Sequence, residues 1–209
     1  MGLLHVVDPG PFRDPVVIVA FDAWVDAGEA ASAVAGLLAE DAPIVARLDG
    51  DRLFDYRSRR PTLEIVDGRP TSLTWPEVAI RRFAGARRDL LVLSGAEPDY
   101  RWQELADDLV AWSRAAGVRE WLSIGAIPAA VAHTRPVPII GTSSRDGLLR
   151  GDIVPGPEGT MRVPAACLSV IDLAVTGAGI PAAGYFAQVP HYVSGPYPAA
   201  SLALLDAIG

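Results

Sequence analysis

Two segments with apolar centres, at residues 15–21 and 89–95, constrain the fold of this chain more than any other feature. Both are rich in Val, Ile or Leu and lack the polar alternation of a half-exposed strand. Such runs are typical of strands that are covered on both faces. Because polar residues and then a helical pattern follow each run, the sequence predicts repeated strand–loop–helix units and a mostly parallel sheet.

The segment after the first run predicts a helix over residues 26–40. Asp26 and Glu29 have the spacing of an acidic capping box, which favours a helix start at Asp26. The many alanines and Gly36 would let this helix approach a sheet or a partner helix closely.

The segment after the second run predicts a helix over residues 100–117, with Gly117 as its C-terminal stop. Asp107 and Asp108 fall on its polar side, and we expect them to be solvated. The apolar positions with helical spacing are Trp102, Leu105, Leu109, Trp112 and Ala116.

Shorter patterns predict the remaining elements. Asp67 and Gly68 predict a hairpin turn, and the polar, arginine-rich residues 49–61 predict a mobile loop. The further strands are expected at residues 44–48, 63–66, 72–75, 121–126, 138–142 and 182–189, and the further helices at 164–179, buried on almost every side, and 199–208. With no repeat or linker, we expect a single α/β domain over residues 1–209.

Charge and composition disfavour several classes of protein. The formal net charge is -7 and every basic residue is arginine, a balance that argues against generic nucleic-acid binding. The basic clusters at 57–60, 81–82 and 87–88 are predicted to lie on solvated faces. There is no signal-peptide pattern and no apolar stretch long enough to span a membrane, so we expect a cytoplasmic protein.

The single cysteine, Cys167, excludes an internal disulfide, and its apolar context predicts a buried residue. Three histidines without i, i+4 spacing predict no metal site. Neither standard Gly-rich phosphate loop is present, and we expect no cofactor. The tryptophans Trp102, Trp112 and Trp121 are predicted to anchor the core or an interface.

Polar residues follow four of the predicted strands directly, where open α/β sheets tend to bind ligands. Parallel strands would bring these segments to one edge, which we call the strand-end rim. Its candidate residues are Asp22, Trp24, Asp26, Glu97, Asp99, Arg101, His133, Arg135, His191 and Tyr192.

The rim has two interpretations. As a small-molecule site, it would use His133 or His191 as acid or base, Arg101 and Arg135 to hold an anion, and the carboxylates to orient a hydroxyl or water. As structure, His133 would cap a turn, Arg101 would pair with Glu97, and Glu97 and Asp99 would favour the start of the following helix.

The same segments resemble a known family. The matching stretches are residues 20–28, 93–99 together with Trp102, 133–136 and 189–193, and they occur in the expected order over about residues 15–200. The chain resembles the actinobacterial branch of the proteasome assembly chaperone 2 family. This resemblance implies a phosphorylase/hydrolase-like αβα sandwich with a central mixed sheet, self-association, and proteasome subunits as possible partners.

Some relatives carry a C-terminal hydrophobic-Tyr-x tail that docks on the proteasome α ring, but residues 205–209 lack that pattern. The motif-like residues 191–193 are internal, so that role is not transferred. Bacterial members continue as further helices, and we therefore expect this chain to lack a C-terminal helical part. The leading hypothesis is a non-enzymatic assembly-chaperone-like or protein-interaction protein. The alternatives are an enzyme or binder of a nucleoside-like or phosphorylated small molecule at the rim, and a purely structural subunit of another complex.

Overall fold

A large sheet organises the chain, of which a computed structural model describes residues 2–157 and 159–209. Nine strands of this described part form the sheet, in the order β1-β3-β6-β7-β2-β8-β11-β9-β10. Four neighbouring strands at its centre run parallel. They are β7 (Asp89–Gly95), β2 (Val16–Phe21), β8 (Glu120–Ala129) and β11 (Ala182–Pro190).

Strand β2 explains why the sheet must be covered on both sides. All six of its residues are buried, and successive side chains of a strand point to opposite faces. Val17 and Val19 enter one apolar cluster together with residues of the helices on that face. Ile18 and Ala20 enter a second cluster on the other face.

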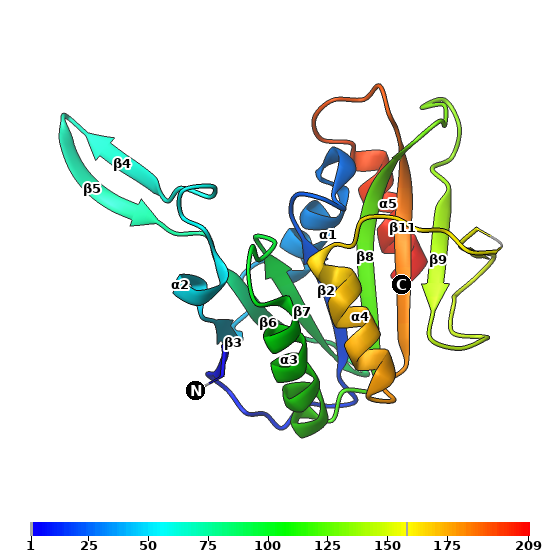
Figure 1. Cartoon of the computed structure of the whole chain (residues 1–209), viewed down its shortest axis with the longest axis horizontal. Helices are drawn as coiled ribbons and strands as arrows, with labels where there is room; N and C mark the ends of the chain where they lie inside the picture. Colours follow the sequence, from blue (N-terminus) through cyan, green and yellow to red (C-terminus); the bar gives the residue numbers. More distant parts are fainter. Residues whose placement is uncertain (1, 158) are drawn as a thin grey trace.

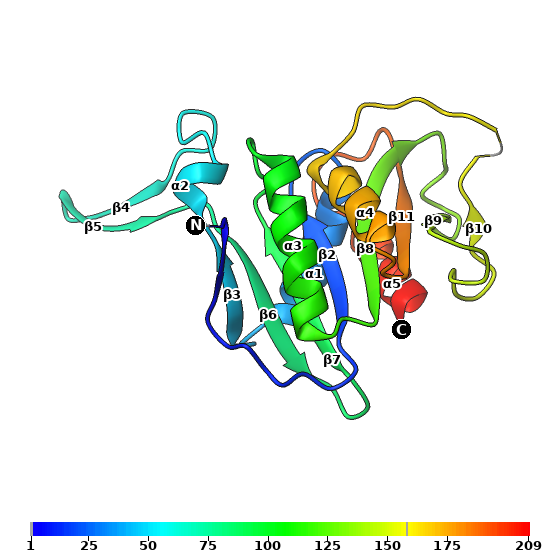
Figure 2. The same ribbon diagram turned by 60° about the horizontal axis from the view of Figure 1, so that its bottom comes forward.

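Two pairs of helices supply this cover (Figures 1 and 2). Helices α3 (Trp102–Ala116) and α4 (Cys167–Gly177) pack together on one face. Helices α1 (Ala30–Ala39) and α5 (Pro198–Ile208) pack together on the other. Cys167 is buried at the start of α4, as the sequence predicts.

Antiparallel strands extend the sheet at both sides. On one side lie β6 (Val78–Ala84), β3 (Ile44–Leu48) and β1 (Leu4–Val6), each antiparallel to its inner neighbour. On the other side, β9 (Ile139–Ser143) is antiparallel to β11, and β10 (Val154–Pro155) is parallel to β9. The predicted αβα sandwich around a mixed, centrally parallel sheet is thus confirmed.

A separate hairpin projects from this body (Figure 1). It consists of β4 (Thr62–Val66) and β5 (Arg69–Thr74), and every residue of both strands is exposed. The predicted turn is confirmed, because Asp67 and Gly68 have φ angles of 50° and 76°, the left-handed values that a two-residue hairpin turn requires.

Some local predictions are wrong. Residues 81–82 lie on β6, which the sequence analysis missed, and not on a solvated loop or helix. Arg82 pairs there with the fully buried Asp89, at 2.8 Å between Nη2 and Oδ2. The predicted loop at 49–61 contains a short helix, α2 (Gly50–Leu53), which the Asp49 side chain caps.

Two helical predictions also need correction. Asp108 is not solvated: its Oδ2 atom accepts hydrogen bonds from the backbone N–H groups of Leu3 and Leu4 and so fastens the N-terminal segment to α3. Helix α4 is buried on only one side, since Leu173 on its outer side is 76% exposed. Among the described residues, every helix is too short or too polar to cross a lipid bilayer.

Candidate functional site

The strand-end rim is formed by the loops that follow the four parallel strands, at the upper edge of the sheet in Figure 1. The strands end at Phe21, Gly95, Ala129 and Pro190. Because they are parallel, their following loops meet at one edge, as the sequence predicts. Within this rim, the predicted residues separate into an acidic half and a histidine half.

In the acidic half, Asp22 is engaged by groups of the protein itself. Its Oδ1 atom accepts hydrogen bonds from Arg59 Nη1 at 2.8 Å and from the backbone N–H of Glu97 at 3.0 Å. Arg59 belongs to the segment that leads into the hairpin. Asp22 therefore ties two loops and the base of the hairpin together.

Glu97 and Asp99 are engaged in the same way. Glu97 Oε1 accepts a hydrogen bond from the backbone N–H of Cys167 at 2.8 Å, at the N-terminus of α4. Asp99 Oδ2 accepts one from the backbone N–H of Asp55 at 2.8 Å. These bonds supply acceptors for the backbone N–H groups of Cys167, at the start of α4, and of Asp55, in a loop, which would otherwise be unpaired.

The enclosed space between Asp22 and Glu97 is small. A cavity of about 10 Å³ lies between Asp22, Glu97 and apolar neighbours, which is barely the size of one water molecule. Burial raises the pKa of the Cys167 thiol and the nearby Glu97 carboxylate raises it further, so the thiol stays protonated. The enclosed space between Asp22 and Glu97 is too small for a substrate.

Asp26 caps a helix, although not at the predicted position. Its Oδ1 atom accepts hydrogen bonds from the backbone N–H groups of Ala31 at 2.8 Å and Ser32 at 3.2 Å. A 3₁₀ turn over Ala27–Glu29 comes first, and Glu29 has a left-handed φ of 51°, so α1 starts at Ala30. The predicted capping box is therefore wrong, because the chain turns sharply before the helix.

Arg101 does not pair with Glu97. Its Nη1 atom lies 2.7 Å from Glu104 Oε2, three residues later on α3. Both side chains are exposed to a large extent, and ion pairs of this kind contribute little to stability.

The histidine half lies on the other side of the rim. The Tyr192 hydroxyl accepts a hydrogen bond from the His133 backbone N–H at 3.0 Å and lies 3.0 Å from His133 Nδ1. The rings of His191 and Tyr192 meet edge to face at 5.4 Å between centroids. All three residues are exposed.

His133 and Arg135 do not converge with Glu97 on one cavity. His133 and Arg135 line a cavity of about 560 Å³ that runs along α5, but Glu97 is not among its lining residues. Glu97 is engaged by the backbone of α4 instead. His133 and Arg135 therefore share a cavity with Arg150 and Asp206, but not with the carboxylates of the acidic half.

Three aromatic side chains project from the rim to solvent. Trp24, Tyr100 and Tyr192 are 63%, 50% and 53% exposed. Two neighbours, Ala23 and Arg101, have φ angles of 89° and 59°, values that are costly for residues other than glycine and that tend to occur at functional positions. Exposed aromatic residues are typical of protein-binding surfaces.

The hairpin adds apolar surface that the sequence analysis treated only as secondary structure. At its base, the ring centroids of Tyr56 and Trp75 lie 4.7 Å apart. Burial, together with a hydrogen bond from the Tyr56 hydroxyl to Asp51, raises the pKa of Tyr56 to about 12. The signal in the sequence was a pair of short apolar strands without a third strand to cover them. The exposed apolar residues are Leu63, Ile65, Val66, Leu73 and Trp75.

Within the described ranges, no group of three or more His, Cys, Asp or Glu side chains is arranged to hold a metal ion. The rim and the hairpin both present apolar or aromatic groups to solvent.

Comparisons of this chain with a family model and with solved structures point to the same family. The model of the PAC2 family matches residues 20–209. A proteasome-assembly chaperone homologue of Mycobacterium tuberculosis is 36% identical, with a TM-score of 0.83 over 92% of this chain and 83% of that one. A Corynebacterium glutamicum protein of unknown function is 31% identical, with a TM-score of 0.89 over 99% of this chain and 80% of that one.

A more distant likeness concerns the fold alone. The archaeal proteasome activator PbaB of Pyrococcus furiosus is 12% identical, with a TM-score of 0.75 over 98% of this chain and 86% of that one. No curated protein sequence matches the chain. The family match over nearly the whole chain, supported by the mycobacterial relative, confirms the resemblance seen in the sequence, and this chain belongs to the PAC2 family.

Proposed function

We propose that this protein is a non-enzymatic, assembly-chaperone-like protein that docks on other proteins, with proteasome subunits as its partners. One observation carries the proposal: the carboxylates of the strand-end rim are used to hold the rim together, while its aromatic side chains face solvent. A rim of this construction favours binding of a protein surface over conversion of a small molecule.

The carboxylates are poor candidates for acid–base chemistry because their bonds support the fold. A hydrogen bond to a charged group contributes about 1.5–3 kcal/mol. Releasing Glu97 would leave the Cys167 N–H at the start of α4 without its acceptor. Releasing Asp22 would leave Arg59 and the Glu97 N–H unpaired.

The hairpin is the second docking element. An isolated two-stranded hairpin is marginally stable in water, and a contiguous exposed apolar surface is typical of a binding site. Since Arg59 and Asp55 bond to Asp22 and Asp99, the base of the hairpin is fixed to the acidic half of the rim. Rim and hairpin can therefore engage one partner together.

Self-association is the further part of this proposal, through α1 and α5. Helix α1 carries no charged residue, and Leu37 on α1 and Leu202 on α5 are both largely exposed. A groove of about 350 Å³ lies between the two helices. Helices with little polar surface are normally buried, which supports a homo-oligomer. A buried, reduced Cys167 fits the proposed cytoplasmic location.

The partner class is supported by the name of the mycobacterial relative, which describes a proteasome-assembly chaperone homologue. The test uses purified proteasome α and β subunits of the source organism, mixed with this protein and followed by native mass spectrometry during assembly. We expect a complex with subunits or assembly intermediates. Trp24→Ala with Tyr100→Ala is expected to weaken this complex, whereas Leu173→Ala, on the outer side of α4, is not. A complex equally stable in all variants, or no complex, would contradict the proposal.

A further inference from the structure

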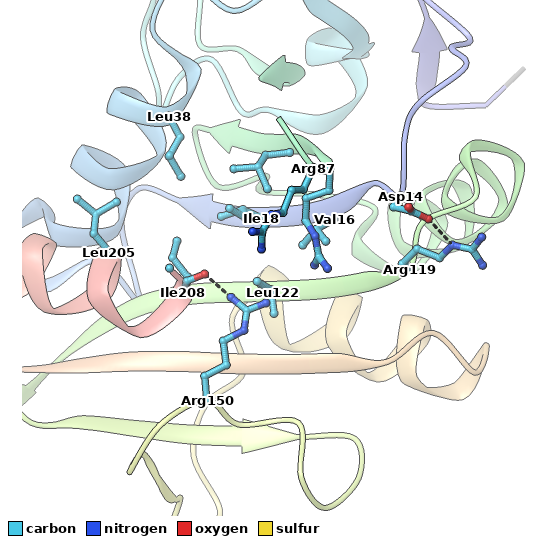
Figure 3. Close-up of a pocket in the computed structure, with 13 residues that line it drawn as sticks. Asp14, Val16, Ile18, Leu38, Arg87, Arg119, Leu122, Arg150, Leu205 and Ile208 are labelled. Atoms are coloured by element: carbon cyan, nitrogen blue, oxygen red, sulfur yellow. Dashed lines mark hydrogen bonds and ion pairs between the residues drawn. The ribbon is translucent and has the colours of Figure 1, made fainter. Parts of the chain in front are cut away.

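A cavity of about 790 Å³ lies at the end of the sheet opposite the rim (Figure 3). It is enclosed by the starts of the parallel strands and by the C-terminal ends of α1 and α5. Ile18 and Leu122 lie beneath it and are only 2% and 1% exposed, so the accessible apolar lining comes from other residues. Leu38 and Leu205 form an apolar wall. Its volume is in the range of small-molecule sites, about 300–1,000 Å³.

Arginines surround the apolar part of this cavity. Arg87, Arg88, Arg119 and Arg150 all line it, and Figure 3 shows Arg87 and Arg150 reaching in from opposite sides. They come from the β6–β7 turn, the approach to β8 and the segment after β9. A fold with a formal net charge of -7 thus gathers four of its arginines around one cavity.

The carboxylates nearby neutralise only part of this charge. Glu120 Oε2 lies 3.0 Å from Arg150 Nη2 and 3.7 Å from Arg88 Nη1, so one carboxylate serves two guanidinium groups. Asp14 lies 3.5 Å from Arg119 in a largely exposed pair. In the described part of the chain, Arg87 makes no ion pair. In the 209-residue protein, four guanidinium groups face three carboxylates, those of Glu120, Asp14 and the terminal Gly209 that also lines the cavity, which leaves an excess of one positive charge.

Arg150 also has a fixed position. Its guanidinium donates a hydrogen bond to the backbone carbonyl of Ile208, in the last turn of α5. Arg150 is therefore held between Glu120 and the helix end, beside the apolar wall. A guanidinium that is already ordered loses less side-chain entropy when it binds an anion.

We propose that this cavity binds a small amphipathic organic anion, with a phosphate or carboxylate head against Arg87 and Arg88 and an apolar body of an aromatic ring or short acyl chain against Leu38 and Leu205. Guanidinium groups pair with the two oxygens of such heads in a bidentate manner. The apolar wall of Leu38 and Leu205 removes part of the ligand body from water. This inference is independent of protein docking at the rim.

The test is isothermal titration calorimetry of the 209-residue protein with octyl phosphate below its micelle-forming concentration. Inorganic phosphate and octanol supply the head and the body separately. We expect octyl phosphate to bind with one molecule per chain and at least about tenfold more tightly than either part. We expect the affinity to fall with added salt, because the arginines are partly exposed.

Variants locate the site. Arg87→Gln with Arg88→Gln should weaken octyl phosphate binding by about tenfold or more. The matched control is Arg57→Gln with Arg60→Gln, which removes two exposed arginines far from the cavity and should leave the affinity unchanged. Leu205→Asn should weaken octyl phosphate binding and leave inorganic phosphate unaffected. Backbone NMR shifts on titration should cluster at residues 87–90 and 205–208.

If the Arg87/Arg88 variant and the Arg57/Arg60 variant lost the same affinity for octyl phosphate, the binding would be nonspecific charge attraction, and the proposal would be overturned. The proposal would also be overturned if neither octyl phosphate nor octanoate, which carries a carboxylate head in place of the phosphate, bound at millimolar concentration. If Arg87→Gln with Arg88→Gln then changed the oligomeric state, the cavity would belong to a protein interface. The proteasome-subunit experiment does not probe this cavity, so the two proposals can fail separately.

Discussion

Arg59 Nη1 lies 2.8 Å from Asp22 Oδ1 and joins the segment before the β4–β5 hairpin to the loop after β2. The same Asp22 oxygen accepts the backbone N–H of Glu97. One carboxylate therefore connects the hairpin, the loop after β2 and the loop after β7. Position and orientation of the hairpin relative to the rim depend on this contact.

The first prediction concerns this pair. Arg59→Gln should lower the free energy of unfolding by about 0.5–1 kcal/mol, because Asp22 is about half exposed and the ion pair is partly screened. Asp22→Ala should cost more, about 1–3 kcal/mol, since it also leaves the Glu97 N–H unpaired. Urea denaturation measures both. In the double variant, the two losses should not add, and strict additivity would contradict the contact.

The second prediction separates the two halves of the rim. Glu97→Ala should destabilise the protein by about 0.5–2 kcal/mol, because it removes the acceptor for the N–H at the start of α4. His133→Ala with Arg135→Ala should change stability by less than about 0.5 kcal/mol, because both side chains are exposed. Thermal melts compare the variants. A large fall in the melting temperature of the variant with His133→Ala and Arg135→Ala would show that these two residues support the fold.

The third prediction concerns pH. Burial raises the pKa of Asp172 from 3.8 to about 6, although a hydrogen bond from Ser123 Oγ, at 2.5 Å, opposes the shift. Between these values the folded protein binds more protons than the unfolded chain. Its free energy of unfolding therefore falls, through this group, as pH rises from about 4 to 6.

Removing the charge of the Asp172 side chain should remove this dependence of the free energy of unfolding on pH. Asp172→Asn should be more stable than the parent by about 1–3 kcal/mol at pH 7.5, and this advantage should vanish below about pH 4. Urea denaturation across this range tests it, with the exposed Asp107→Asn as control. A constant difference between Asp172→Asn and the parent at every pH would rule out the raised pKa.

The fourth prediction concerns the hairpin. Ile65→Ser with Leu73→Ser should leave the melting temperature nearly unchanged, because both side chains are about half exposed or more. The same change should weaken the complex with proteasome subunits by about tenfold or more, if these residues anchor the partner. Binding is measured by biolayer interferometry, with Leu173→Ser as the control. Unchanged affinity would exclude the hairpin from the interface.

Local patterns were sufficient for most of the fold. The run at residues 15–21 predicted a strand covered on both faces, and the spacing of Leu105, Leu109 and Trp112 predicted a helix with one buried side, and both are confirmed. Strand β6 was missed because Arg81 and Arg82 interrupt its apolar pattern after the first three residues. Those arginines are tolerated because β6 lies between antiparallel neighbours on the outer part of the sheet, and Arg82 meets the buried Asp89.

The sequence by itself determined the parallel centre of the sheet, the helices on both faces and the presence of polar loops at one edge. It did so because burial of apolar side chains follows the local period of the chain. Only the tertiary structure decided that Glu97 meets the N–H of Cys167, seventy residues later, and that His133 meets Tyr192. Such contacts depend on how loops distant in sequence close against one another. That closure is fixed by the packing of the whole sheet and its helices, and no local pattern records it.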